Sequence, residues 1–83
     1  MQKVKNVKPM PDYELHITFV NGEVKYFSVK PYLDKGIFKE LKNPKYFKSV
    51  KVFLDSVCWP NGQDFDPDHL YKEGINKSLN QKV

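Results

Sequence analysis

A chain of 83 residues forms one small domain at most, and its hydrophobic fraction of 40% is too high for a fully disordered protein. The single cysteine, Cys58, excludes an intramolecular disulfide, and no apolar run approaches the length of a membrane span. The net charge is +4 and every basic residue is a lysine, although bidentate recognition of phosphate groups favours arginine. We therefore expect a cytoplasmic protein with no membrane contact.

The N-terminal third of the chain predicts a strand followed by a β-hairpin. The first strand is expected over residues 3–8, and a proline-rich break follows it. Residues 13–20 then alternate between apolar and polar side chains, which is the period of a half-buried strand. Asn21 and Gly22 predict a type I′ turn, with positive φ at both residues, into a returning strand over 23–29.

The middle of the chain predicts short helices and a second hairpin. Residues 37–41 have the rhythm of one or two helical turns, which should stop before the next proline. Residues 48–54 predict a strand with Val50, Val52 and Leu54 on one face. A turn at Asp55 and Ser56 then leads into a strand that starts at 57–59.

Together these elements predict an α+β fold: a small antiparallel sheet built from two β-hairpins, with two or three short helices at one face or end. The last helix is expected over 67–73. Residues 1–73 should form a single compact domain. Residues 74–83 carry few apolar side chains and no periodicity, so they are predicted to form a flexible C-terminal tail.

The segment from Ser56 to Gly74 has the densest apparent chemistry. Asp64, Asp66 and Asp68 alternate like the first ligands of a calcium loop, but the glycine and glutamate that complete such a loop are missing. Asp66 suits a helix N-cap and Asp68 the first helical turn. Asp64 is not explained by capping, and together with His69 it remains a candidate polar site for acid–base or metal chemistry.

Two other reactive side chains have simpler interpretations. Cys58 stands in a short apolar strand, where a free cysteine behaves as a small hydrophobic residue. His16 falls on the polar face of the first hairpin and is interpreted as a solvated strand residue. No catalytic constellation is predicted, so we expect a protein that is not an enzyme and that binds no cofactor or metal.

Lysines recur every three or four residues along the middle of the chain, with aromatic residues between them. A basic stripe of this kind is typical of nucleic-acid binding. The aromatic residues are also needed for the core, and Asp34 and Glu40 interrupt the stripe. The stripe is therefore a candidate surface for a protein partner or, as the alternative, for nucleic acid. Its members are Lys35, Lys39, Lys42, Lys45, Lys48 and Lys51.

Four short motifs resemble a bacterial family, the domain of unknown function 2442. They are FVNGE at 19–23, GIFKEL at 36–41, YFKSV at 46–50 and the longer signature WPNGQDFDPDHLY at 59–71. The resemblance implies a small α+β domain with no established activity. It also implies that the gene can lie beside one for another small protein, as in toxin–antitoxin pairs.

Size, surface charge and resemblance together predict a non-enzymatic protein-interaction or regulatory module, antitoxin-like in a gene pair. Its partner would be a protein. Binding of nucleic acid through the stripe from Lys35 to Lys51 is the alternative function.

Overall fold

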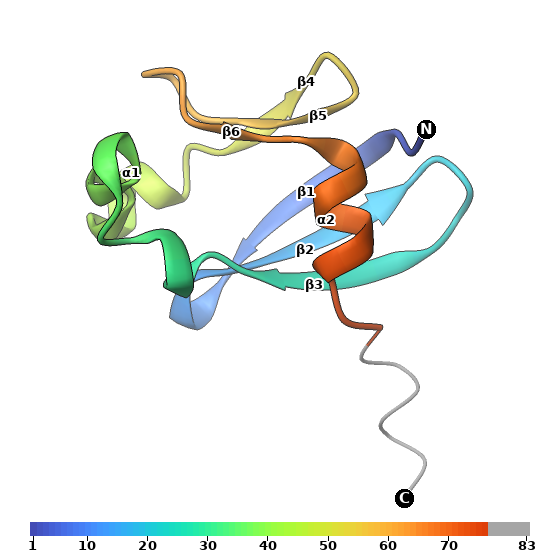
Figure 1. Cartoon of the computed structure of the whole chain (residues 1–83), viewed down its shortest axis with the longest axis horizontal. Helices are drawn as coiled ribbons and strands as arrows, with labels where there is room; N and C mark the ends of the chain where they lie inside the picture. Colours follow the sequence, from blue (N-terminus) through green and yellow to red (C-terminus); the bar gives the residue numbers. More distant parts are fainter. Residues whose placement is uncertain (77–83) are drawn as a thin grey trace, which may run out of the picture.

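The structure is a computed structural model that describes residues 1–76 (Figure 1). Its strands form two three-stranded antiparallel sheets, in the orders β1-β2-β3 and β4-β5-β6. The predicted α+β class is confirmed, with the strands divided between two sheets. In chain order the elements are β1 (Val4–Met10), η1 (Pro11–Tyr13), β2 (Glu14–Phe19), β3 (Val24–Ser28), η2 (Lys30–Tyr32), η3 (Gly36–Lys42), α1 (Pro44–Phe47), β4 (Lys51–Phe53), β5 (Ser56–Cys58), β6 (Asp64–Phe65) and α2 (Pro67–Glu73), where η denotes a 3₁₀ helix.

The first hairpin forms as the alternation of its side chains predicts. Leu15, Ile17 and Phe19 on β2 are fully buried, and β2 pairs with β1 on one side and β3 on the other. The predicted turn type is wrong, because only Gly22 has a positive φ (94°), whereas a type I′ turn would require one at Asn21 as well. The N–H of Gly22 instead donates to the carbonyl of Phe19 (2.9 Å). Gly22 thus takes the left-handed position that follows a tight turn.

β1 is longer than predicted. It continues through Pro9 to Met10, where a break was expected. Pro9 is tolerated because β1 is at the edge of its sheet, where a missing N–H removes no ladder hydrogen bond to an outer strand.

The second hairpin turns one residue earlier than predicted. Leu54 and Asp55 both have positive φ (49° and 67°), and Phe53 pairs with Ser56 across them. The turn is therefore a two-residue turn with both central residues left-handed, the geometry that glycine and asparagine adopt most readily. Asp55 was predicted to lie in the turn, whereas Leu54 was predicted to be the last residue of the strand.

The prediction that one face of the fourth strand is apolar and buried is also wrong. Val50 is buried, but Val52 is 36% exposed and Leu54 is 81% exposed. Leu54 lies in the turn, so it cannot continue the alternation of a strand. Because β4 contains three residues in place of the predicted seven, it contributes less to the core than expected.

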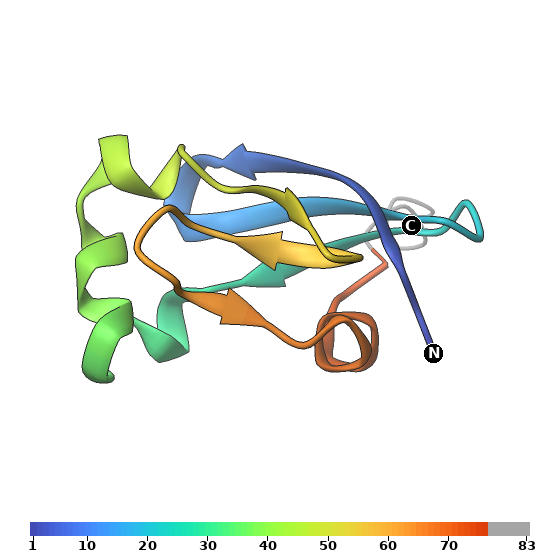
Figure 2. The ribbon, with the colours of Figure 1, turned by 90° about the horizontal axis from the view of Figure 1, so that it is seen from above.

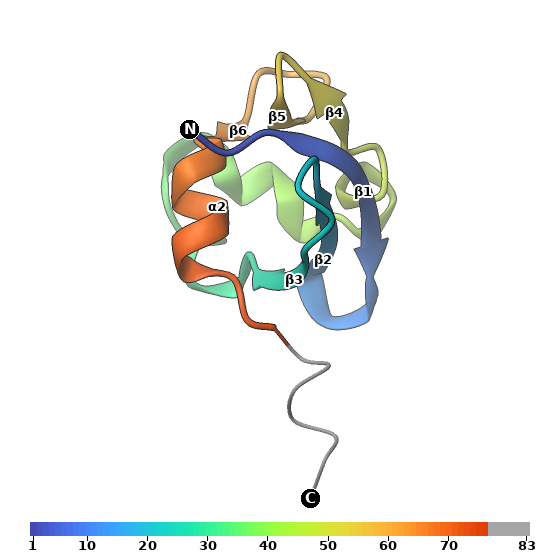
Figure 3. The ribbon, with the colours of Figure 1, turned by 90° about the vertical axis from the view of Figure 1, so that its right-hand side faces the viewer.

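The core lies between the two sheets. In Figure 3, α2 closes one flank of the space between them and β1 closes the opposite flank. The backbone N–H of Val4 donates to the carbonyl of Asp55 (2.8 Å), which ties the first sheet to the second hairpin. Residues 36–47 cover one end of the sheets, as predicted (Figure 1). The largest fully buried apolar side chains are those of Trp59, Phe19, Leu15, Ile17, Leu41 and Leu70.

The described chain continues past the predicted domain end at Glu73. Ile75 exchanges two backbone hydrogen bonds with Tyr26 on β3, each 2.8 Å long. Ile75 thus forms an isolated bridge to the edge of the first sheet, within the segment that the sequence predicted as a tail. The rest of that predicted tail, 77–83, lies outside the described residues. Within 1–76, none of the helices is long and apolar enough to cross a membrane.

Candidate functional site

The WPNGQ segment forms a loop that is bound to the helical end of the molecule. The indole N–H of Trp59 donates to the backbone carbonyl of Phe47 (2.9 Å), at the end of α1. Gln63 is 1% exposed, and its amide nitrogen donates to the carbonyl of Ile37 (2.9 Å) and to Glu40 (3.0 Å). The amide oxygen of Gln63 accepts from the hydroxyl of Tyr46 (2.6 Å). The most specific part of the sequence signature is thus a structural clamp.

Sequence reasoning missed three members of this clamp: Glu40, Tyr46 and Gln63. Their hydrogen bonds join residues 17 to 26 positions apart, so no local spacing reveals them. The sequence offered one signal for this clamp: Gln63, a polar residue, directly follows the Pro60–Gly62 turn in a segment that was expected to return to the core.

Glu40 is held in its charged form by the clamp. The side-chain amide of Asn61 donates to it (2.7 Å), and this hydrogen bond, followed by that from Gln63, lowers the pKa of the Glu40 carboxyl below its ordinary value near 4.5. A carboxyl whose pKa is lowered by folding stabilises the native state above its unfolded pKa, and that stabilisation is lost as the pH falls through the folded pKa.

We therefore expect the Glu40→Gln variant to be less stable than the wild type at pH 7. The difference should shrink as the pH falls from about 5 to about 3, because the wild-type carboxyl then becomes protonated. Urea unfolding at a series of pH values measures this. A difference that stays constant across the range would contradict the role given to the charge of Glu40.

In the structure, the side chains of the predicted polar pair, Asp64 and His69, do not contact each other through a hydrogen bond or ion pair. His69 Nε2 lies 2.8 Å from the hydroxyl of Tyr32, and its ring is half-buried against the rings of Phe27 and Phe65. Asp64 is exposed on β6. Within residues 1–76 no hydrogen bond or ion pair connects them, and no group of three potential metal ligands is found.

The helix-capping interpretation of the neighbouring carboxylates is confirmed. Asp66 is the N-cap of α2, and its carboxylate accepts from the backbone N–H of His69 (3.3 Å). Asp68 lies in the first turn and accepts from the backbone N–H of Gln2 (2.8 Å). Of the three alternating carboxylates, Asp64 is the one without a hydrogen bond or ion pair in the described chain.

His16 and Cys58 differ from their predicted environments. His16 is half-buried, with its ring at right angles to that of Tyr26 (centroids 5.0 Å apart), and not fully solvated. Its Nδ1 is buried without a hydrogen-bond partner among the described residues. Cys58 is half-exposed on β5, because its side chain faces away from the core.

All six lysines of the predicted stripe are exposed. They follow the chain from the start of η3 through α1 to β4. Lys42 forms an ion pair with Asp34 (2.8 Å), which holds the pKa of that carboxyl below its ordinary value. The other five form no ion pair within the described chain. The stripe therefore carries mostly uncompensated positive charge.

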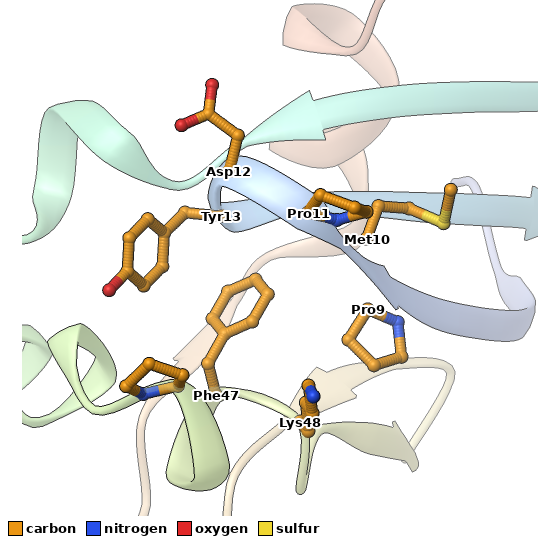
Figure 4. A pocket seen from close by; sticks show the side chains of 8 residues that line it. Pro9, Met10, Pro11, Asp12, Tyr13, Phe47 and Lys48 are labelled. Carbon is orange, nitrogen blue, oxygen red and sulfur yellow. The ribbon is translucent and has the colours of Figure 1, made fainter.

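An apolar groove adjoins this stripe, between η1 and α1 (Figure 4). Its volume is about 380 Å³. The ring of Phe47 packs edge-on against that of Tyr13 inside it, with centroids 5.3 Å apart. The lining residues are Pro9, Met10, Pro11, Asp12, Tyr13, Pro44, Phe47 and Lys48.

Backbone strain and charge are concentrated at the rim of the groove. Asp12 and Tyr13 have positive φ (65° and 60°), which is uncommon for residues other than glycine. Asp12 is ion-paired with Lys30 (2.8 Å), so its charge is compensated. Lys48 has no such partner in the described chain, so the net charge that the groove presents is positive.

Comparisons with known proteins give one family and one solved structure. The model of the family "Protein of unknown function (DUF2442)" matches residues 4–76. A crystal structure of a "putative DNA binding protein" from Nitrosomonas europaea is similar over the whole of this chain, with 26% sequence identity and a TM-score of 0.76. The similar region spans 54% of that longer chain. No curated protein sequence matches significantly.

Proposed function

The chain belongs to the DUF2442 family, whose members have no assigned function, and we propose that it is a small non-enzymatic module that binds and regulates a protein partner. The observation that carries this proposal is the apolar groove between η1 and α1, with strained backbone on one side and, on the other, Lys48, which forms no ion pair within residues 1–76. Strained residues persist where the surrounding structure maintains them, and they cluster at binding and switching sites.

The side chains that line the groove indicate which kind of partner segment it can bind. Its lining is mainly proline, methionine and aromatic carbon, which suits a segment with one or two large apolar side chains. Lys48 at the rim, with Lys45 on the helix α1 that ends just before it, favours carboxylates beside those side chains. We therefore propose an acidic, apolar segment of a protein as the occupant. The gene-pair arrangement implied by the family resemblance makes the neighbouring gene product the first partner to examine.

Charge reversal at the rim of the groove tests this function. Lys48→Glu should weaken binding of the co-purified partner at least about tenfold, because like charges then meet at the interface. Lys72→Glu is the matched control: it makes the same charge change on an exposed residue of α2 and should alter the dissociation constant by less than about twofold. Isothermal titration calorimetry measures both. Absence of a stoichiometric partner, or equal effects of the two variants, would refute the proposal.

Nucleic-acid binding through the lysine stripe is the second candidate. The exposure of all six lysines favours it, as does the description of the similar Nitrosomonas europaea protein, although that description applies to a longer chain. Fluorescence anisotropy with a 20-base-pair DNA duplex at low salt separates the two functions. DNA binding should weaken in a Lys39→Glu/Lys45→Glu variant and be unaffected by Met10→Ser in the groove, whereas binding of a protein segment should be reduced by Met10→Ser.

A further inference from the structure

The outer face of the second sheet is uncovered. In Figure 2, which is seen from above, β4, β5 and β6 lie in front of the first sheet, and no described element passes over them. The strand register places Lys51 opposite Cys58, and Cys58 opposite Asp64, so these three side chains form a row across the sheet. Phe53, two residues beyond Lys51 on β4, points to the same side.

This face exposes two large apolar side chains to solvent. Phe53 is 55% exposed and Leu54 is 81% exposed. Leu54 has a φ of 49°, a conformation that disfavours leucine and suits asparagine or glycine. A large apolar side chain is thus presented to solvent from a position where its backbone conformation is unfavourable.

Two hollows flank the centre of the face. One, of about 340 Å³, lies toward α2, and the other, of about 380 Å³, lies toward the Pro60–Gly62 turn. Both are lined by Phe53, Cys58 and Asp64, which therefore form the ridge between them. A surface with a central ridge and a hollow on either side can interlock with a rotated copy of itself.

The charged residues in the row across the sheet are also arranged so that the face can complement a second copy of itself. Lys51 lies at one end, Asp64 at the other and the small, uncharged Cys58 between them. Neither charged residue forms an ion pair within residues 1–76. A rotation of 180° about an axis that lies in the interface, parallel to the strands and above Cys58, turns a second copy face to face with the first and exchanges the two ends of the row, so Lys51 of each copy would face Asp64 of the other.

We propose that this face, defined by Lys51, Phe53, Leu54, Cys58 and Asp64, joins two copies of the chain in a twofold-symmetric dimer. The exposed rings of Phe53 pack into the hollows of the opposite copy, and the two Lys51–Asp64 pairs fix the orientation. The dimer face is separate from the groove at η1 and α1, so a dimer presents two grooves.

Charge reversal with rescue tests the dimer. Sedimentation equilibrium over about 10 µM to 1 mM should show a monomer–dimer equilibrium for the wild type, the range in which a small interface becomes populated. Lys51→Glu should weaken the dimer at least about tenfold, because it places two carboxylates together at both symmetric contacts. Asp64→Lys should do the same, and the double variant Lys51→Glu/Asp64→Lys should return to within about threefold of the wild type.

Cys58 provides an independent readout, because it is the only cysteine and lies near the proposed axis. A short bismaleimide linker should join two wild-type chains through thioethers in high yield. The control is Cys58→Ser combined with Ser28→Cys, which moves the thiol to an exposed position on the first sheet and should not cross-link. A chain that stays monomeric to 1 mM, a double variant as weak as the single ones, or equal cross-linking from position 28 would overturn the proposal.

Discussion

Replacing Trp59 with alanine should lower the free energy of unfolding by about 3–5 kcal/mol, the usual range for removing a fully buried tryptophan. The side chain is 1% exposed and is the largest in the core. Its ring lies 6.0 Å from that of Phe47 and 6.1 Å from that of Phe65, and its N–H donates to the carbonyl of Phe47. The substitution therefore leaves a large cavity between the two sheets and α1, and it removes the indole hydrogen bond to the Phe47 carbonyl.

Urea unfolding followed by far-ultraviolet circular dichroism measures the loss without relying on Trp59 fluorescence. A domain of this size has a total stability of only about 4–12 kcal/mol, so Trp59→Ala could leave the chain unfolded in water. Trp59→Phe retains a ring and loses only the N–H and some volume, and it should cost about 1–3 kcal/mol. Asp64→Ala is the matched surface control and should change stability by less than about 0.5 kcal/mol. A Trp59→Ala effect as small as that of Asp64→Ala would show that the signature tryptophan is not a core residue.

The parts of the fold that were predicted correctly depend on local patterns. The alternation of Leu15, Ile17 and Phe19 identified a half-buried strand because the period of a strand is two residues wherever one face is buried. The Asp-Pro-Asp sequence at 66–68 identified the start of α2 because its capping bonds connect residues three positions apart. Both signals lie within a few residues of the structure that they specify.

The prediction of the second hairpin was wrong because the local sequence pattern was misleading. Val50, Val52 and Leu54 alternate like the buried face of a strand, but the chain turns at Leu54. The turn is fixed by the pairing of Phe53 with Ser56 and by the contact between Val4 and Asp55 from the opposite end of the chain. The contact between Val4 and Asp55 is distant in sequence, so it leaves no periodic signal.

The sequence indicated some of the candidate surfaces and not others. The lysine stripe was found from spacing alone, and its exposure in the structure agrees with that pattern. The apolar groove was not anticipated, because it is assembled from residues 9–13 and 44–48, two segments joined only by the tertiary fold. The dimer face was not anticipated either, since Lys51, Cys58 and Asp64 become a row only when three short strands are in register.

The buried amide of Gln63 should be the second most sensitive position. Gln63→Leu nearly preserves the side-chain volume, yet it should lower the free energy of unfolding by about 2–4 kcal/mol, because it removes the three hydrogen bonds of a side chain that is only 1% exposed. Thermal and urea unfolding measure the loss.

The environment of Gln63 explains why a hydrophobic residue cannot replace it. Its amide bonds to the carbonyl of Ile37, the carboxylate of Glu40 and the hydroxyl of Tyr46 together, and leucine can make none of these three hydrogen bonds. Asn61→Ala, which removes an exposed hydrogen bond to the same Glu40, should cost less than about 1 kcal/mol. A double-mutant cycle between Gln63→Leu and Tyr46→Phe should give a coupling energy above about 0.5 kcal/mol. Strictly additive effects would mean that the clamp is a set of independent contacts and not a single network.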